Sequence, residues 1–388
     1  MSQLDLKVIL EALQKVLPQE QSCIGLHEPY FIGNEWVYVK ECLDTRWVSS
    51  VGKFVDNFES SLAKYTGVNR AVAVVNGTAA LHICLQLIGV KAGDEVLIPS
   101  LTFVATANAV SYCGAIPHFI DSEETTLGID PKKLGNYLDS IAEIKSEGCC
   151  NRKTGRFIKA IIAVHTFGHP VDLDALYQVC EHFQLTLIED AAESLGSFYK
   201  GRHTGNWGKV TALSFNGNKI ITTGGGGAIL TQDDSLANLA KHMTTTAKLP
   251  HRWAFNHDQV SYNYRLPNIN AAIGCAQLEN LPEILSAKRA LAEKYAQIFQ
   301  QIYGIKFFTE PDYAHSNYWL NTLLLNEDYA AQRNDLLELT NNYGIMTRPA
   351  WTLMHKLPMY KDFPRMNLEV AESLESRIIN IPSSAFLV

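Results

Sequence analysis

The chain has 388 residues, of which 47% are hydrophobic and 19% are charged, a balance typical of globular proteins and not of disordered ones. Its formal net charge is −7 and it contains no long basic run, so nucleic acid is not expected as its main partner. No apolar run reaches the roughly 18 residues of a membrane-spanning helix, and the first residues lack the basic start of a secretory signal.

The first predicted element is an amphipathic helix near the N-terminus, with one face formed by Leu4, Leu6, Ile9, Leu10, Leu13 and Leu17. From residue 70 onward, short apolar segments alternate with helical ones. Strands are predicted at 70–76, 94–100, 116–121, 158–168, 185–190, 210–215 and 228–232. The polar segment 122–157 indicates a helix and a surface excursion. This alternation predicts a mostly parallel sheet with helices on both faces.

The character of the sequence changes after about residue 245, where helical segments such as 282–303 dominate. The stretches KFFTEP (306–311) and YWLNTLLLN (318–326) then indicate strands of a separate, small α+β domain. We therefore predict a large domain of residues 1–245, which includes the N-terminal helix, and a small domain of residues 246–388.

Eight cysteines are scattered along the chain without a C-x-x-C pair, and only Cys149 and Cys150 are adjacent. This pattern favours free thiols in a reducing cytoplasm over a zinc site or a disulfide framework. We expect a cytoplasmic protein without a metal site.

Polar residues follow the predicted strands, at the sheet edge where open α/β sheets bind ligands. The Gly77-Thr78 turn opens a helix whose backbone amides suit a phosphate, and Ser214 can add a hydroxyl. Asp190 ends a buried strand and needs a cationic partner. Lys219, which precedes a run of four glycines, can form a Schiff base, and Phe103 can stack on a flat ring. Together these groups indicate pyridoxal phosphate (PLP).

Each feature also has an ordinary alternative. A lysine beside glycines is most often a surface loop residue, an aspartate after a strand is most often a cap or turn former, and a glycine run can be a flexible hairpin. Their joint occurrence at successive strand ends favours the cofactor site over these separate explanations.

Six motifs support this interpretation, and they occur in the order N-G-T-A-A-L-H, G-D-E-V-L-I-P-S-L-T-F-V-A-T-A-N-A, H-T-F-G-H-P-V-D-L-D, I-E-D-A-A-E-S-L-G-S, S-F-N-G-N-K-I-I-T-T-G-G-G-G and Y-N-Y-R-L-P-N-I-N-A-A-I-G. From about residue 24 to the C-terminus, the chain resembles the DegT/StrS nucleotide-sugar aminotransferases, which are fold-type I PLP enzymes. The resemblance implies a large domain with a mostly parallel seven-stranded sheet flanked by helices, and a smaller C-terminal α+β domain.

The resemblance also implies roles for individual residues. Lys219 matches the lysine that forms the Schiff base, and Asp190 matches the partner of the pyridinium nitrogen. The other implied cofactor contacts bind the phosphate, stack on the ring or help to place it: Gly77, Thr78, Phe103, Glu193, Ser214, Asn216 and Asn263. Because Asn263 matches an asparagine that reaches the phosphate from the other subunit, the resemblance implies a homodimer with shared active sites.

One position departs from the family pattern. The third residue after Asp190 is usually glutamine or histidine and faces the phenolic oxygen of the cofactor, whereas here it is Glu193. A carboxylate would repel a phenolate unless it is protonated or turned away, so its protonation state stays open.

A second set of residues matches segments that approach the sugar nucleotide: Trp47, Ser49, Ser50 and Arg348. His165, near a strand end, is a further candidate for the substrate pocket. Trp47 could instead belong to the core, Arg348 to a surface ion pair, and His165 could be a buried histidine with satisfied hydrogen bonds.

Within the family, the segments H-E-P-Y-F-I-G-N-E-W and W-V-S-S-V-G-K-F-V-D resemble the branch of the legionaminic acid pathway. This implies transamination of a UDP-linked 4-keto-6-deoxy-N-acetylhexosamine by glutamate, giving a 4-amino sugar for surface polysaccharide or nonulosonic acid synthesis. A GDP- or dTDP-linked sugar of the perosamine or viosamine type, or amination at C3, is the alternative. A non-catalytic regulator that binds PLP or a sugar nucleotide is the alternative of another class, and the presence of Lys219, Asp190 and Ser214 argues against it.

Overall fold

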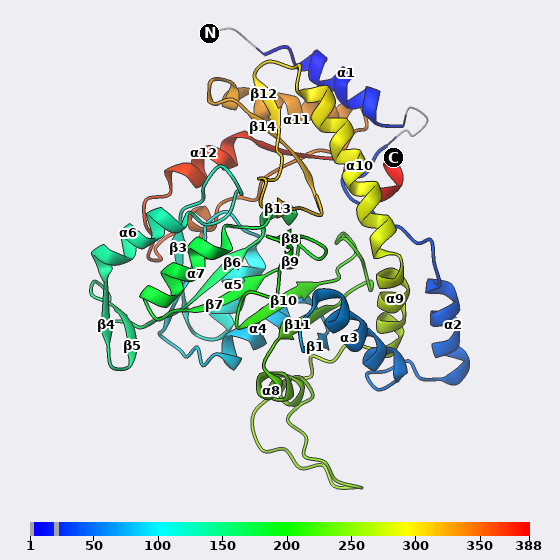
Figure 1. Cartoon of the computed structure of the whole chain (residues 1–388), viewed down its shortest axis with the longest axis vertical. Helices are drawn as coiled ribbons and strands as arrows, with labels where there is room; N and C mark the ends of the chain where they lie inside the picture. Colours follow the sequence, from blue (N-terminus) through cyan, green and yellow to red (C-terminus); the bar gives the residue numbers. More distant parts are fainter. Residues whose placement is uncertain (1–3, 19–22) are drawn as a thin grey trace.

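The computed structural model describes residues 4–18 and 23–388 (Figure 1). At its centre is a seven-stranded sheet with the strand order β1-β11-β10-β7-β6-β2-β3. Its strands are β1 (Arg70–Val74), β2 (Glu95–Pro99), β3 (Ile116–Ile120), β6 (Ile158–Val164), β7 (Thr186–Asp190), β10 (Val210–Ser214) and β11 (Gly227–Thr231). β11 pairs antiparallel with β1 and β10, and the other strand pairs of this sheet are parallel. The predicted, mostly parallel sheet is confirmed.

Helices cover both faces of this sheet, which is why its strands are apolar on both sides. Alternate residues of β1 enter different cores. Val72 and Val74 pack with α4 (Gly77–Leu87), α5 (Val104–Tyr112) and α8 (Asp234–Thr244). Ala71 and Ala73 belong to the core of the opposite face, with α3 (Lys53–Thr66) and α9 (Asn268–Glu279). Helices α6 (Pro131–Ile141) and α7 (Leu173–His182) cover the part of the sheet near β2 and β6.

Two predicted segments differ from the structure in their details. The strand predicted at 158–168 ends at Val164, because Phe167 adopts a left-handed backbone conformation with φ 56° within a short 3-10 turn, Thr166–Gly168. The excursion within 122–157 is an antiparallel hairpin, formed by β4 (Ala142–Lys145) and β5 (Gly148–Asn151) after α6.

A second, antiparallel sheet has the order β12-β14-β16-β15. Its strands are β12 (Ile305–Phe307), β14 (Asn321–Leu325), β15 (Arg348–Pro349) and β16 (Ile378–Ile381), accompanied by α10 (Leu281–Phe299), α11 (Arg333–Asn342) and α12 (Glu369–Arg377). Further elements include α2 (Glu35–Thr45) and a small sheet of β8 (Phe198–Tyr199), β9 (Arg202–His203) and β13 (Ala314–His315).

Two helices pack against the part of the chain that lies on the other side of the predicted domain boundary. The N-terminal helix α1 (Leu6–Val16) lies beside α10, at the opposite end of the molecule from α8 (Figure 1), and its Leu10 and Leu13 share a core with Leu291 and Tyr295. Its apolar face is therefore buried against the second sheet's helices and not against the large sheet. Helix α9, which follows residue 245, packs instead on α2 and α3. The boundary itself stays a prediction.

Across residues 4–18 and 23–388, no helix combines the length and apolarity needed to cross a bilayer. The same residues include no cluster of three or more His, Cys, Asp or Glu side chains suited to a metal ion. All eight cysteines are free thiols.

Candidate active site

A cavity of about 220 Å³ lies where the carboxyl ends of β1, β2, β6, β7 and β10 converge. Eight of the nine predicted cofactor residues line it: Gly77, Thr78, Phe103, Asp190, Glu193, Ser214, Asn216 and Lys219. These residues come from four separate segments of the chain, and the parallel sheet brings their strand ends to one edge.

The turn between β1 and α4 forms one end of the cavity. Asn76 caps α4, since its Oδ1 accepts a hydrogen bond from the Ala79 backbone amide at 2.8 Å. A side chain at Gly77 would place its Cβ 2.9 Å from the Ser214 Cβ, so only glycine allows this approach. The first amides of a helix have no acceptor within it and attract anions. This end of the cavity therefore suits a phosphate.

The glycine run after Lys219 permits a second close approach. Gly227 begins β11 and pairs with both Val74 and Ser214, the last residues of the adjacent strands. A Cβ at Gly227 would lie 2.6 Å from the carbonyl carbon and oxygen of Asn76. The absence of a side chain thus lets β11 lie against the turn that opens α4.

We expect Gly227→Ala to lower the free energy of unfolding by about 1–3 kcal/mol, because backbone atoms cannot move aside as a flexible side chain can. Urea unfolding of the cofactor-free protein measures this. Gly225→Ala is the matched control, since its added methyl group would meet no atom within 4 Å. Equal stability of the two variants would contradict the packing argument.

Asp190 ends β7 and is 6% exposed. Its Oδ2 accepts a hydrogen bond from the Thr106 hydroxyl at 2.8 Å, and its Oδ1 accepts one from the Ala192 amide at 3.2 Å. Burial raises the pKa of Asp190, and these two donors offset that effect only in part. A buried carboxylate of this kind is stabilised by a cation, such as the protonated ring nitrogen of PLP.

Lys219 enters the cavity from the loop after β10. Its Nζ donates to Glu193 Oε1 at 3.3 Å and lies 3.9 Å from the centre of the Trp319 ring. Glu193 Oε2 accepts a hydrogen bond from the Phe167 amide at 2.9 Å. Burial raises the pKa of Glu193 to about 7, although the nearby Lys219 opposes the shift.

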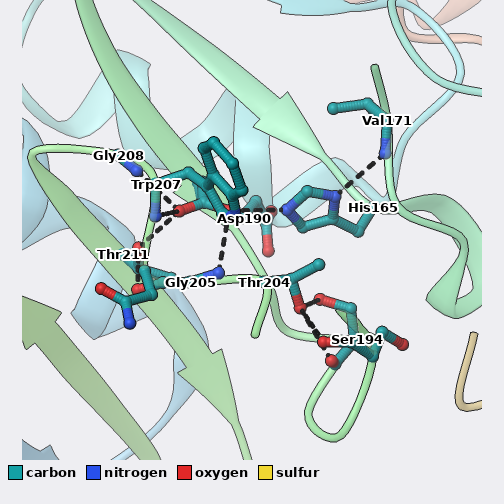
Figure 2. A network of polar contacts seen from close by, with 12 residues as sticks. His165, Val171, Asp190, Ser194, Thr204, Gly205, Trp207, Gly208 and Thr211 are labelled. Carbon is teal, nitrogen blue, oxygen red and sulfur yellow. Dashed lines mark hydrogen bonds and ion pairs between the residues drawn. The ribbon is translucent and has the colours of Figure 1, made fainter. Parts of the chain in front are cut away.

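His165 does not line the cavity. It is fully buried, its Nε2 lies 3.0 Å from Glu189 Oε2, and its Nδ1 accepts a hydrogen bond from the Val171 amide at 3.3 Å (Figure 2). Because Nδ1 accepts, the proton lies on Nε2 and is donated to Glu189. The same carboxylate accepts hydrogen bonds from the backbone amides of Gly205, Trp207 and Gly208, as Figure 2 shows. The structure favours the alternative of a satisfied core histidine that braces the loop before β10.

The other predicted residues also lie outside the cavity of this chain. Asn263 is exposed and accepts a hydrogen bond from Arg265 Nε at 2.9 Å. Trp47, Ser49 and Ser50 lie in the loop between α2 and α3, where Trp47 is 57% exposed and so does not belong to the core. Arg348 is exposed on β15 and donates to Asn341. Their predicted roles toward the nucleotide sugar stay predictions.

Several further cavity residues were not predicted from the sequence, among them Thr106, Asn218, Trp319 and Trp351. Thr106 lies within the motif T-F-V-A-T-A, so a helical reading of this motif could have placed its hydroxyl near the strand ends. The two tryptophans come from the second part of the chain, far from the motifs of the large sheet, and they do not follow a strand of that sheet, so the argument from strand ends could not place them.

The residues present fit PLP. An anion-binding helix end, a lysine and a buried carboxylate without a cationic partner border one cavity. Among the described residues, no Lys, Arg or His nitrogen forms an ion pair with Asp190. The helix amides can donate to a phosphate, the lysine amine can condense with an aldehyde, and the carboxylate can accept a hydrogen bond from a pyridinium nitrogen.

Comparison with known proteins agrees with this geometry. The profile of the DegT/DnrJ/EryC1/StrS aminotransferase family matches residues 31–387. The GDP-perosamine synthase of Caulobacter vibrioides is 38% identical over 367 residues, covering 94% of each chain. The putative pyridoxal phosphate-dependent aminotransferase EpsN of Bacillus subtilis is 37% identical over 366 residues, covering 93% of this chain and 91% of EpsN.

A solved structure extends the similarity to the fold. The aminotransferase TlmJ from Streptoalloteichus hindustanus superimposes with a TM-score of 0.85 at 27% identity, covering 94% of this chain and 95% of TlmJ. The predicted fold class, a large α/β unit with a smaller α+β part, is that of PLP aminotransferases. The chain belongs to the DegT/DnrJ/EryC1/StrS aminotransferase family and is a PLP-dependent aminotransferase.

Proposed function

We propose that the protein transfers the amino group of glutamate to C4 of a nucleotide-linked 4-keto-6-deoxy sugar, and that the nucleotide is GDP. The observation that carries the choice of nucleotide is the name of the relative with 38% identity, GDP-perosamine synthase, which two further relatives at 37% and 35% identity share. The UDP-linked N-acetylated sugar and the legionaminic acid pathway have no comparable support, so they become the competing outcome.

Each of the main cavity residues has a separate role in the proposed reaction. PLP, when bound, supplies a ring that withdraws electrons from the substrate's reacting carbon. Asp190 holds the proton on the ring nitrogen, which keeps that ring electron-poor. Lys219 is the base placed to move the proton at the reacting carbon. Asn76 and Gly77 present the helix N-terminus to the phosphate, and Ser214 lies beside it.

A homodimer with shared active sites is part of the proposal. Asn263 lies outside the cavity of its own chain and is exposed, so it is available to a second copy. It belongs to the segment between α8 and α9, which projects away from the body of the molecule (Figure 1). That segment carries Trp253 and Phe255, which are 74% and 76% exposed, and large apolar side chains of this kind favour a protein interface.

The test is the specificity ratio of the PLP-loaded enzyme toward GDP- and UDP-linked 4-keto-6-deoxy sugars, with glutamate as donor. We expect kcat/KM to be at least about tenfold higher for the GDP-linked hexose, because discrimination reflects differential binding of the transition state. A ratio that favours the UDP-linked N-acetylated sugar would overturn the choice of nucleotide. Cofactor binding without turnover of any sugar would instead support the non-catalytic regulator.

A further inference from the structure

Glu193 is the position at which the sequence departs from the family pattern. The resemblance points its carboxylate toward the phenolic oxygen of the cofactor, and in the structure this carboxylate lies against Lys219. We propose that Glu193 and Trp319 form a resting site for the Lys219 amine, in which Glu193 exchanges a proton with the lysine. This inference rests on the proposed function only in taking Lys219 as the catalytic lysine.

Both partners in the pair are removed from water. The side chains of Lys219 and Glu193 are 13% and 6% exposed, and the nitrogen lies 3.3 Å from Oε1. On its other side, the nitrogen lies over the Trp319 ring at 3.9 Å, a distance typical of a cation–π contact. A free ammonium group in this cavity therefore has two stabilising neighbours.

Two groups besides Lys219 hold Glu193 in place. Its Oε2 accepts from the amide of Phe167, a residue in the left-handed region at φ 56°, where residues other than glycine are uncommon. The Asn317 side-chain amide donates to the backbone oxygens of Glu193 and Leu195, at 2.9 Å each. A backbone held in a rarely populated conformation so that it can donate to one carboxylate oxygen suggests a function for that carboxylate.

Trp319 is fixed by the residue that precedes the lysine. Its indole Nε1 donates to the Asn218 carbonyl oxygen at 2.6 Å. The ring is 4% exposed and cannot rotate without losing this bond. The face presented to Lys219 is thus set by the same loop that carries the lysine.

The chemical need for such a site follows from the catalytic cycle. The Lys219 amine is free of the cofactor whenever an amino-acid substrate takes its place there. The free amine must then gain and lose a proton. If Lys219 as ammonium gives a proton to the Glu193 carboxylate, the products are a neutral amine and a neutral carboxylic acid. The pair carries no net charge before or after the transfer, so no uncompensated charge forms in the buried cavity.

The surrounding titratable groups are compatible with this exchange. Burial places the pKa of Glu193 at about 7, and the charge of Asp190 also raises it. His27 lies beyond Trp319, with the ring centres 6.5 Å apart, and burial keeps its pKa well below the ordinary value. Lys288, whose Nζ donates to the Trp319 carbonyl oxygen at 3.2 Å, is fully buried, and burial lowers its pKa as well. Because burial favours the neutral forms of His27 and Lys288, neither side chain places a permanent positive charge beside the Lys219–Glu193 pair.

The test compares Glu193→Gln with the wild-type protein and with Glu59→Gln. Glu59 forms a matched lysine–carboxylate pair with Lys241, at 2.6 Å, outside the cavity. The first readout is the pH titration of the visible band of the PLP-loaded protein, which reports the protonation of the Lys219 nitrogen. Removing the neighbouring negative charge should lower the midpoint by about one pH unit or more in Glu193→Gln, and not in Glu59→Gln.

The second readout uses the cofactor-free protein and no sugar. Acetylation of Lys219 by acetic anhydride, followed by peptide mass spectrometry, should be faster in Glu193→Gln at neutral pH, because a larger fraction of the amine is neutral. Trp319→Phe should shift both readouts in the same direction by less, and it serves as the second variant if Glu193→Gln fails to fold.

Unchanged titration and labelling in Glu193→Gln would overturn the inference, as would an equal change in Glu59→Gln. These outcomes are separate from the proposed function, because the sugar substrates enter neither measurement. A shifted labelling profile in a protein that aminates no sugar would support the Lys219–Glu193 pair and overturn only the proposed substrate.

Discussion

Replacing Lys219 with alanine is expected to reduce transamination by at least about 10³-fold, since one side chain supplies both the covalent attachment and the base. The cavity should still bind PLP, because the helix N-terminus at Gly77 and the Asp190 carboxylate remain. Borohydride reduction should then fail to link the cofactor to the chain. Formation of keto acid from glutamate in a single turnover measures the loss.

Lys209→Ala is the control for this substitution. Lys209 is an exposed lysine that pairs with Asp233, and it lies outside the cavity. Its variant should keep the activity and the covalent link of the wild-type protein. Retention of either property at the wild-type level in Lys219→Ala would contradict the assignment of the lysine.

Asp190→Asn is expected to reduce kcat by about 10²–10³-fold, the size of effect typical of removing one preorganised electrostatic partner. An amide cannot hold the proton on the ring nitrogen as a carboxylate does, so the ring would withdraw electrons less strongly. Steady-state kinetics with glutamate measure the loss. Asp139→Asn, on the exposed surface of α6, is the control, and an equal effect there would contradict the assignment.

The same substitution should have a different effect on stability. Burial raises the pKa of Asp190 in the folded, cofactor-free protein above its ordinary value of 3.8. Stability contributed by a group with a raised pKa is present below the unfolded pKa and is lost as the pH rises through the folded one. Cofactor-free Asp190→Asn should therefore be at least as stable as the wild-type protein at neutral pH. Its advantage should shrink as the pH falls toward 3.8.

These two residues show which parts of the site could be predicted from the sequence. Lys219 and Asp190 follow apolar strands, and a parallel sheet brings such strand ends to one edge whatever the packing details are. Gly77 and Ser214 could be placed for the same reason. The glycine run is also explained by local chemistry, because Gly227 must approach the Asn76 backbone.

The contacts between these segments could not be predicted in this way. His165 also stands at a strand end, yet it turns away from the cavity, because the buried Glu189 and the Val171 amide occupy both of its nitrogens. Strand position sets where a residue lies along the sheet, whereas its partners decide which way the side chain points. The position of α1 beside α10 has the same origin, since an amphipathic pattern shows that one face is buried but not against which element.

The amino-acid sequence by itself determined the alternating α/β order, the family and the residues that meet at the carboxyl edge of the sheet, because strand and helix patterns depend on neighbours close in the chain. Only the tertiary structure decided that Glu193 pairs with Lys219 and that Trp319 covers the amine. Trp319 lies a hundred residues beyond Lys219, and its contact depends on how the second sheet packs against the first. Long-range packing of this kind leaves no periodic trace in the sequence.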